Sequence, residues 1–186
     1  LISHGVLYNA CSLHQLASYG RLFPGNEVSV RINPGLGSGH SNRTNVGGPS
    51  SSFGIWHEYL QQVLATAAEH DLRITGLHSH IGSGSDPEVW QRCARLTLEV
   101  AAQLPDIQRV SMGGGFKVGR MTGEVSTDLQ EAGKPVAGEF ERFAQEHGRE
   151  LHLEVEPGTF FVANAGALVC GIIDVVDTGA EGNRFI

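Results

Sequence analysis

The chain has 186 residues, of which 40% are hydrophobic and 18% charged, and its formal net charge is -7. This composition is that of a globular protein with a sizeable core, and the acidic balance argues against nucleic acid or an anionic membrane surface as a partner. No apolar run approaches the roughly 20 residues that a membrane-spanning helix needs. The cysteines Cys11, Cys93 and Cys170 are far apart and form no CxxC pair, so we expect buried, reduced thiols and a cytoplasmic location.

The first elements of the chain predict two strands with a helix between them. Residues 5–11 have the pattern of a short buried strand, and Ser12 is a suitable N-cap for the helix that follows. Residues 27–33 alternate between apolar and polar side chains, which is the period of a strand with one buried face.

A long segment rich in glycine, serine and asparagine, residues 34–54, comes next. Loops of this length are often lids or binding loops, and disorder is the alternative interpretation. From Ile55 the apolar residues recur with the period of a helix. Its apolar stripe carries Trp56, Leu60, Val63 and Ala67.

The rest of the chain repeats the alternation of strands and helices. Strands are predicted at 72–80, 107–112 and 151–156, followed by a β-branched run at 167–176. Asp86 before Pro87 predicts a capped helix start, and a further helix is expected from about Pro135.

A helical pattern between successive strands is typical of a parallel sheet with crossover helices. Eight such units need at least roughly 250 residues, so only part of a barrel fits this chain. The sequence therefore predicts an α/β protein, either a partial (β/α)8 barrel or an open doubly wound sheet. Because the chain begins at Leu1 without a methionine and ends soon after an apolar run, we expect a fragment.

Three segments that follow predicted strands carry residues suited to a ligand site: His78–Ser83, Gly113–Gly115 and Glu156–Gly158. The carboxyl ends of parallel strands share one edge of a sheet, and α/β proteins bind ligands at that edge. We therefore expect the three segments to form one site.

His78 and His80 lie two residues apart on a strand, so their side chains share a face. Such a pair can bind a metal ion, contact another ligand, or simply pack. A metal ion needs further ligands, which His152, Glu154 or Glu156 could supply only if their strands are neighbours.

The other candidate residues also have two interpretations each. Gly113, Gly114 and Gly115 permit close approach of the main chain, either to a phosphate or within a tight turn. The pattern matches neither the dinucleotide fingerprint nor a Walker loop. Glu156 could hold a ring nitrogen or act as a base, or be a surface carboxylate. Arg31 could bind a carboxylate or phosphate, or form a salt bridge.

Taken together, these motifs resemble the diaminopimelate decarboxylases, within the fold-type III pyridoxal-phosphate decarboxylases that also act on ornithine and arginine. Each motif alone is weak, whereas five in the family's order are specific. The matching segments are Val30–Gly35, Thr44–Gly48 with Ser52–Ile55, Gly76–Gly84, Gly113–Gly115 and Glu154–Gly158.

The resemblance implies a partial (β/α)8 barrel of the alanine-racemase type, lacking its first strands and its C-terminal β-domain. Residues 1–165 would be the barrel part, and residues 166–186 a strand leading into the β-domain. The full-length protein would be a homodimer with shared active sites, and the fragment alone would be poorly soluble because its sheet edges are unpaired.

The resemblance also implies pyridoxal 5'-phosphate as the cofactor and no metal. His80 would stack on the pyridine ring and Glu156 would hold its nitrogen, as the two catalytic side chains of this chain. Cofactor contacts are implied for Arg31, His80, Ser83, Gly113, Gly114, Gly115, Glu156, Pro157, Gly158 and Thr159.

Two departures from the family pattern bear on activity. Thr159 stands where the family has an arginine that helps hold substrate or phosphate, so Thr159 is also a candidate substrate contact. The Schiff-base lysine of the family would lie ahead of this chain, and neither Lys117 nor Lys134 matches its motif. We therefore expect the chain alone to be inactive.

The expected reaction of the whole protein is decarboxylation of an amino acid, with meso-diaminopimelate giving L-lysine and carbon dioxide. A pyridoxal-phosphate-binding homologue without catalysis is one alternative. The other is a metal-dependent barrel hydrolase that uses His78 and His80.

Overall fold

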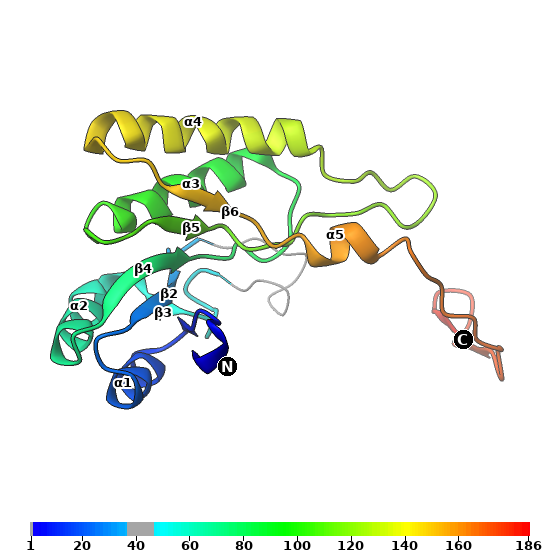
Figure 1. Cartoon of the computed structure of the whole chain (residues 1–186). Helices are drawn as coiled ribbons and strands as arrows, with labels where there is room; N and C mark the ends of the chain where they lie inside the picture. Colours follow the sequence, from blue (N-terminus) through cyan, green and yellow to red (C-terminus); the bar gives the residue numbers. More distant parts are fainter. Residues whose placement is uncertain (1, 37–46) are drawn as a thin grey trace.

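The computed structural model describes residues 2–36 and 47–186. Its centre is a parallel sheet of six strands (Figure 1). The strands are β1 (Asn9–Ala10), β2 (Glu27–Asn33), β3 (Ile55–Trp56), β4 (Arg73–His78), β5 (Arg109–Ser111) and β6 (His152–Glu154).

The strand order distinguishes the two predicted architectures. The main path is β1-β2-β4-β5-β6, with β3 paired to β2, so neighbouring strands follow the order of the chain. A doubly wound sheet reverses direction at a switch point, whereas a barrel adds each strand beside the preceding one. The sheet is therefore that of a partial barrel, and the doubly wound alternative is wrong.

Helices connect the strands and cover one face of the sheet, where α2, α3 and α4 follow one another in chain order (Figure 1). The helices are α1 (Leu13–Leu22), α2 (Leu60–Glu69), α3 (Pro87–Ala101), α4 (Leu129–His147) and the short α5 (Gly158–Val162), with 3-10 turns at Ile2–His4 and His57–Tyr59. Ser12 and Asp86 cap α1 and α3 as predicted, since each side chain accepts a hydrogen bond from an N–H of the first turn.

The two faces of the sheet differ in polarity. One row of paired residues is apolar and, except at its last position, buried in the core. It consists of Val30, Leu77, Val110 and Leu153. The next row points to the opposite face, because successive strand residues alternate. It consists of Arg31, His78, Ser111 and Glu154. The polar row places the candidate residues on the face away from the helices.

The predicted start of α4 is wrong by about two turns. The helix begins at Leu129, where the Asp128 side chain accepts hydrogen bonds from two first-turn N–H groups, and Pro135 lies inside it. A proline there removes one backbone hydrogen bond, but Ala132 and Val136 are buried against the core. Packing of that apolar face outweighs the lost bond.

The prediction that the second helix begins at Ile55 is also wrong. Ile55 and Trp56 form β3, which pairs with the carboxyl end of β2, and α2 starts only at Leu60. A sequence period cannot reveal that β2 has an edge available for pairing. Asn33 also anchors the preceding segment, donating to Gly48 O at 2.8 Å and accepting from Gly48 N at 2.9 Å. Residues 37–46, part of the predicted loop at 34–54 and of the Thr44–Gly48 motif, lie outside the described residues.

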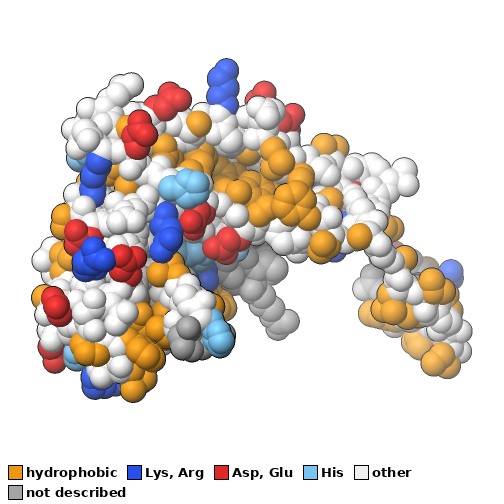
Figure 2. Space-filling view, viewed as in Figure 1, with side chains coloured by type: hydrophobic (Ala, Val, Ile, Leu, Met, Phe, Trp, Pro, Cys, Tyr) orange, Lys and Arg blue, Asp and Glu red, His pale blue; other side chains and the backbone are white. Residues whose placement is uncertain are grey.

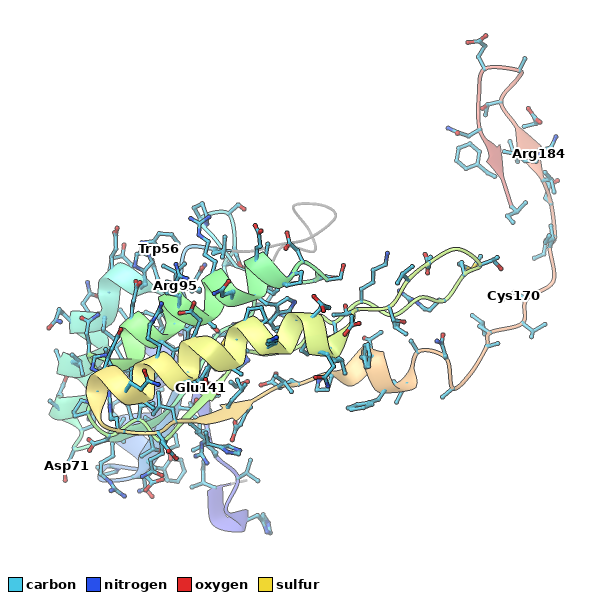
Figure 3. The ribbon with its side chains drawn as sticks, turned by 90° about the horizontal axis from the view of Figure 1, so that it is seen from above. Trp56, Asp71, Arg95, Glu141, Cys170 and Arg184 are labelled. Atoms are coloured by element: carbon cyan, nitrogen blue, oxygen red, sulfur yellow. The ribbon has the colours of Figure 1, made fainter. Side chains whose placement is uncertain are left out.

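The last part of the chain extends away from the sheet, as Cys170 and Arg184 show in Figure 3. Its only strands among the described residues are β7 (Val176–Asp177) and β8 (Arg184–Phe185), which form an antiparallel pair. Residues 167–175, which carry the β-branched run of the sequence, form no strand in the structure. The division of the chain at residues 165 and 166 stays a prediction.

Apolar side chains are exposed along this segment and near α5 (Figure 2). They include Leu153, Val155, Phe161, Val162, Leu168, Val169, Ile172, Ile173, Phe185 and Ile186. The expectation of three buried thiols also fails here, since Cys93 is buried but Cys170 is exposed. Within residues 2–36 and 47–186, no helix is both long and apolar enough to cross a membrane.

The buried carboxylate of Glu139 links α4 to its neighbouring helix α3. The two helices lie side by side in Figure 3. Glu139 on α4 is 3% exposed and accepts hydrogen bonds from Gln91 at 2.8 Å and from Arg95 at 2.8 Å, with Arg142 as a further partner. The Arg95 hydrogen bond lowers the pKa of Glu139 and outweighs burial, which raises it. Glu139 is thus a charge that links two helices, and it is not among the candidate residues at the strand ends.

Candidate cofactor-binding site

The three predicted segments meet beyond the carboxyl ends of β4, β5 and β6. Backbone hydrogen bonds continue past the strands, from Glu156 N to Gly113 O at 2.9 Å and from Gly84 N to Gly115 O at 3.0 Å. The prediction that these segments lie together is therefore confirmed. The pairing also fixes their relative positions, because each segment is bonded to the next.

The glycines at 113–115 are required by neighbouring protein atoms. A Cβ on Gly114 would overlap Glu156 O, and one on Gly115 would overlap Gly82 O. Gly115 also has a φ of +98°, which side-chain-bearing residues rarely adopt. The glycines were predicted to let the main chain approach a phosphate closely. In the structure, the atoms that lie against Gly114 and Gly115 belong to the other two segments.

Glu156 is held by groups from two neighbouring strands. Ser111 Oγ donates to Glu156 Oε1 at 2.7 Å, and His78 Nε2 lies 3.3 Å from the same oxygen. Burial raises the pKa of Glu156. The hydrogen bond from Ser111 and the interaction with His78 together lower it by more, so the pKa of Glu156 is below its ordinary value. Glu156 is therefore an ionised carboxylate with a fixed orientation, and it remains 55% exposed at the pocket.

His80 lies beside Gly113 and is held as a neutral imidazole. Its Nδ1 accepts the N–H of Gly82 at 2.9 Å, which leaves the proton on Nε2. Burial, followed by the charge of Arg31 and the neighbouring His78, lowers the pKa of His80 to about 4. A neutral ring with its face free of charge is suited to stacking on an aromatic ligand.

The depressed pKa of His80 predicts a pH dependence of stability. Between about pH 6.5 and 4 the unfolded chain binds a proton at this histidine and the folded chain does not, so folding stability falls as the pH falls through that window. Burial lowers the pKa of His78 too, which adds in the same direction. Urea unfolding at pH 7 and pH 5 should show a smaller loss of stability for His80→Asn than for the unaltered chain. Equal losses would contradict the assignment.

A cavity of about 590 Å³ opens at these strand ends. Its wall includes His80, Gly82, Ser83, Gly114, Gly115, Phe116, Lys117, Val118, Arg120, Glu124, Glu156, Pro157, Gly158, Thr159 and Phe160. Most of the predicted cofactor contacts therefore line one pocket. Gly113 is not part of this wall but packs against one of its residues, since a Cβ there would overlap the His80 ring.

The residues of this pocket fit pyridoxal phosphate. The backbone N–H groups of Gly114 and Gly115, and the Ser83 hydroxyl, donate to no other described residue, so they remain for a phosphate. His80 offers a neutral ring and Glu156 an ionised carboxylate for the pyridine. The donors and the carboxylate lie on the same pocket, as a ligand with a phosphate and a basic ring nitrogen requires.

Arg31 and the histidine pair lie close to the pocket, and the cofactor contact of Arg31 stays a prediction. The Arg31 guanidinium lies 5.3 Å from the Phe53 ring and outside the pocket wall, although its charge influences both His80 and Glu156. His78 turns Nε2 toward Glu156, and His80 uses Nδ1 for Gly82. Nowhere in residues 2–36 and 47–186 do three metal-ligating side chains gather as a metal site.

The structure brings in residues that the motifs did not indicate. Ser111 holds Glu156, and its Oγ accepts the N–H of Gly113 at 3.2 Å. Ser111 lies two residues before Gly113 on the polar face of a strand, and this position in the sequence could have indicated that it belongs to the site. Trp90 on α3 stacks on Phe116 at 4.5 Å and donates to Gly84 O at 3.3 Å. These aromatic contacts support the glycine segments from the helix side, and no pattern near residue 116 indicates them.

Comparisons with known proteins identify the family. Residues 2–163 match the model of the pyridoxal-dependent decarboxylase, pyridoxal binding domain. The chain therefore belongs to the pyridoxal-dependent decarboxylases and carries a pyridoxal-binding domain.

Within this family, the chain is similar to diaminopimelate decarboxylases. It is 39% identical over 173 residues to that of Streptomyces coelicolor, covering 92% of this chain and 39% of the relative. The Escherichia coli K12 relative is 37% identical over 174 residues, covering 93% of this chain and 41% of the relative. A crystal structure of diaminopimelate decarboxylase matches with a TM-score of 0.82 at 35% identity, covering 92% of this chain and 41% of that one. The chain thus spans about two fifths of the length of these relatives.

Proposed function

We propose that this chain supplies the cofactor-binding part of an enzyme that removes the α-carboxylate of meso-diaminopimelate and forms L-lysine. The observation that carries this proposal is the pocket in which the ionised Glu156, the neutral His80 and the free N–H groups of Gly114 and Gly115 lie together. Each group suits a different part of pyridoxal phosphate, and the three strand-end segments bring them together.

Bound pyridoxal phosphate supplies an electron sink for the charge left on the substrate when carbon dioxide departs. Glu156 holds a proton on the pyridine nitrogen, because an ionised carboxylate raises the basicity of a nitrogen that it faces. Ser111 and His78 orient that carboxylate through its Oε1 atom. His80 would offer the pyridine ring a neutral imidazole, and the hydrogen bond from Gly82 N–H to its Nδ1 orients that imidazole.

The choice of substrate rests on the relatives. The similar proteins of Streptomyces coelicolor and Escherichia coli are named diaminopimelate decarboxylases. A Helicobacter pylori diaminopimelate decarboxylase, 22% identical with a TM-score of 0.69, has been solved in complex with L-lysine. Thr159, at the pocket wall, is the proposed contact of this chain to the substrate, through its hydroxyl. The catalytic lysine and a homodimeric partner are proposed to come from outside the 186 residues.

The test is carbon dioxide release by the whole protein, loaded with pyridoxal phosphate, from carboxyl-labelled meso-diaminopimelate, ornithine, arginine and lysine. Release from meso-diaminopimelate with formation of lysine is the expected result. Cofactor binding without release from any of the four amino acids would identify a non-catalytic homologue. Release from another of them would correct the substrate. Metal analysis of the same sample tests the hydrolase alternative, for which stoichiometric zinc or manganese is required.

A further inference from the structure

The segment after the three glycines, residues 117–127, forms one wall of the pocket and carries two cationic side chains, Lys117 and Arg120. Thr127 fixes the backbone of Lys117 from both sides. The N–H of Lys117 donates to Thr127 Oγ1 at 2.8 Å, and the N–H of Thr127 donates to Lys117 O at 2.9 Å. The segment is therefore held in place over the pocket by its own hydrogen bonds.

Glu124 organises the turn of this segment. Its Oε2 accepts the N–H of Arg120 at 2.8 Å and the N–H of Met121 at 3.2 Å, and these hydrogen bonds lower the pKa of Glu124. Glu124 is thus ionised and uses one oxygen for the backbone. Residues 117–127 carry two positive side chains and one negative side chain, so this segment has a net positive charge.

Within the part of the chain that the structure describes, the charges of Lys117 and Arg120 interact with Glu124 only at a distance, through an electrostatic attraction that contributes to its lowered pKa. Neither the ammonium nor the guanidinium makes a hydrogen bond or ion pair with a residue of 2–36 or 47–186. A solvated surface cation is the usual explanation for such a side chain. Here Lys117 is half-buried beside Val118, which is 9% exposed. Arg120 is exposed, but it belongs to the pocket wall as Lys117 does.

Other groups in the lining of the same pocket are hydrogen-bond donors. They are the N–H groups of Gly114 and Gly115 and the hydroxyl of Ser83. The carboxylate of Glu156 belongs to the same pocket, so a ligand there meets an acidic group as well as this array of donors and cations. We infer that Lys117 and Arg120 form an oxyanion subsite of the pocket, which binds a phosphate monoester or a carboxylate.

The inference rests on the proposed function, which supplies two sources for that oxyanion. One is the phosphate of the cofactor, and the other is a carboxylate of the substrate. Arginine binds either group with two parallel hydrogen bonds, and lysine adds a mobile point charge. The two sources are separated by ligands that differ only in the anionic group.

Isothermal titration calorimetry of the whole protein, freed of bound pyridoxal phosphate, tests the inference with the double variant Lys117→Met plus Arg120→Gln. The controls are Lys134→Met on α4 and Arg92→Gln on α3, which are exposed and lie outside the pocket. The ligands are inorganic phosphate, pyridoxal phosphate and pyridoxal, then meso-diaminopimelate and L-lysine in the presence of saturating pyridoxal phosphate. We expect the double variant to weaken the binding of one oxyanion ligand at least ~10-fold, because a hydrogen bond to a charged group contributes that much. The controls should bind as the unaltered chain does.

Each outcome has a defined meaning. Weaker binding of pyridoxal phosphate and inorganic phosphate, with pyridoxal unchanged, assigns the subsite to the cofactor phosphate. Weaker binding of meso-diaminopimelate, with L-lysine less affected, assigns it to a substrate carboxylate. Equal dissociation constants for the double variant and the unaltered chain with every ligand overturn the inference. If the unaltered whole protein binds no pyridoxal phosphate, the proposed function fails, and inorganic phosphate alone decides the subsite. A loss of phosphate binding on substitution then supports the subsite, and equal or absent binding overturns it.

Discussion

Replacing Glu156 by glutamine is expected to lower the turnover number of the whole enzyme by roughly 10²- to 10⁴-fold, the range of a lost proton-holding group. Glutamine keeps the size of the side chain and can still accept from Ser111, but it carries no negative charge. Its amide cannot hold a proton on the pyridine nitrogen. Carbon dioxide release under saturating substrate measures the effect.

The design separates this role from a structural one. Glu156→Gln should bind pyridoxal phosphate with a dissociation constant within ~10-fold of the unaltered protein, because the phosphate donors are unchanged. Ser111→Ala removes one hydrogen bond to Glu156 Oε1 and leaves the charge, so we expect a smaller loss, about 10-fold. Glu150→Gln, at an exposed position, is the matched surface control. If Glu156→Gln turns over as fast as Glu150→Gln, the proton-holding role is wrong.

Features decided by neighbouring residues in the sequence could be predicted. Ser12 and Asp86 were identifiable as helix caps because a cap depends on one side chain and the N–H groups within three residues of it. The alternation at 27–33 matches β2 from end to end for the same reason. The start of α4 shows the limit of such local signals. Pro135 predicted a helix start there, whereas Asp128 caps the actual start and burial of the apolar helix face keeps Pro135 inside the helix.

The candidate site was predictable in its parts and not in its connections. A period of two places His78 and His80 on one face, and the glycines mark a close approach. Which atoms approach depends on the register of three strands. Only that register brings Ser111 and His78 close to Glu156. Their contacts fix the orientation of a carboxylate that the sequence shows only as a residue before a turn.

The choice between a barrel and an open sheet is likewise a property of strand order. Both architectures repeat the same β-α unit, so their sequences have the same periods. The path β1-β2-β4-β5-β6 is set by which edges pair after the helices pack. Local pattern carries no information on that step, whereas five family motifs in order do.

Replacing Gly115 by alanine is expected to destabilise the fold by at least ~2 kcal/mol, because two costs combine. Its φ of +98° disfavours any residue with a Cβ, and that Cβ would overlap Gly82 O in the neighbouring segment. The segments after β4 and β5 would have to separate, which also breaks the hydrogen bond from Gly84 N to Gly115 O. Urea unfolding followed by circular dichroism measures the loss, and titration with inorganic phosphate measures the effect on the pocket.

Two other glycines divide this effect into its causes. Gly123 has a φ of +88° but open space around its Cβ position, so Gly123→Ala should cost only the backbone strain, about 1 kcal/mol. Gly138 lies on α4 with ordinary helical backbone and open space, so Gly138→Ala should stabilise by about 0.5–1 kcal/mol. The order of stability should therefore be Gly138→Ala, unaltered chain, Gly123→Ala, Gly115→Ala. If Gly115→Ala is no less stable than Gly123→Ala, the segments after β4 and β5 do not pack closely at Gly115, and the arrangement of these segments around the pocket is wrong.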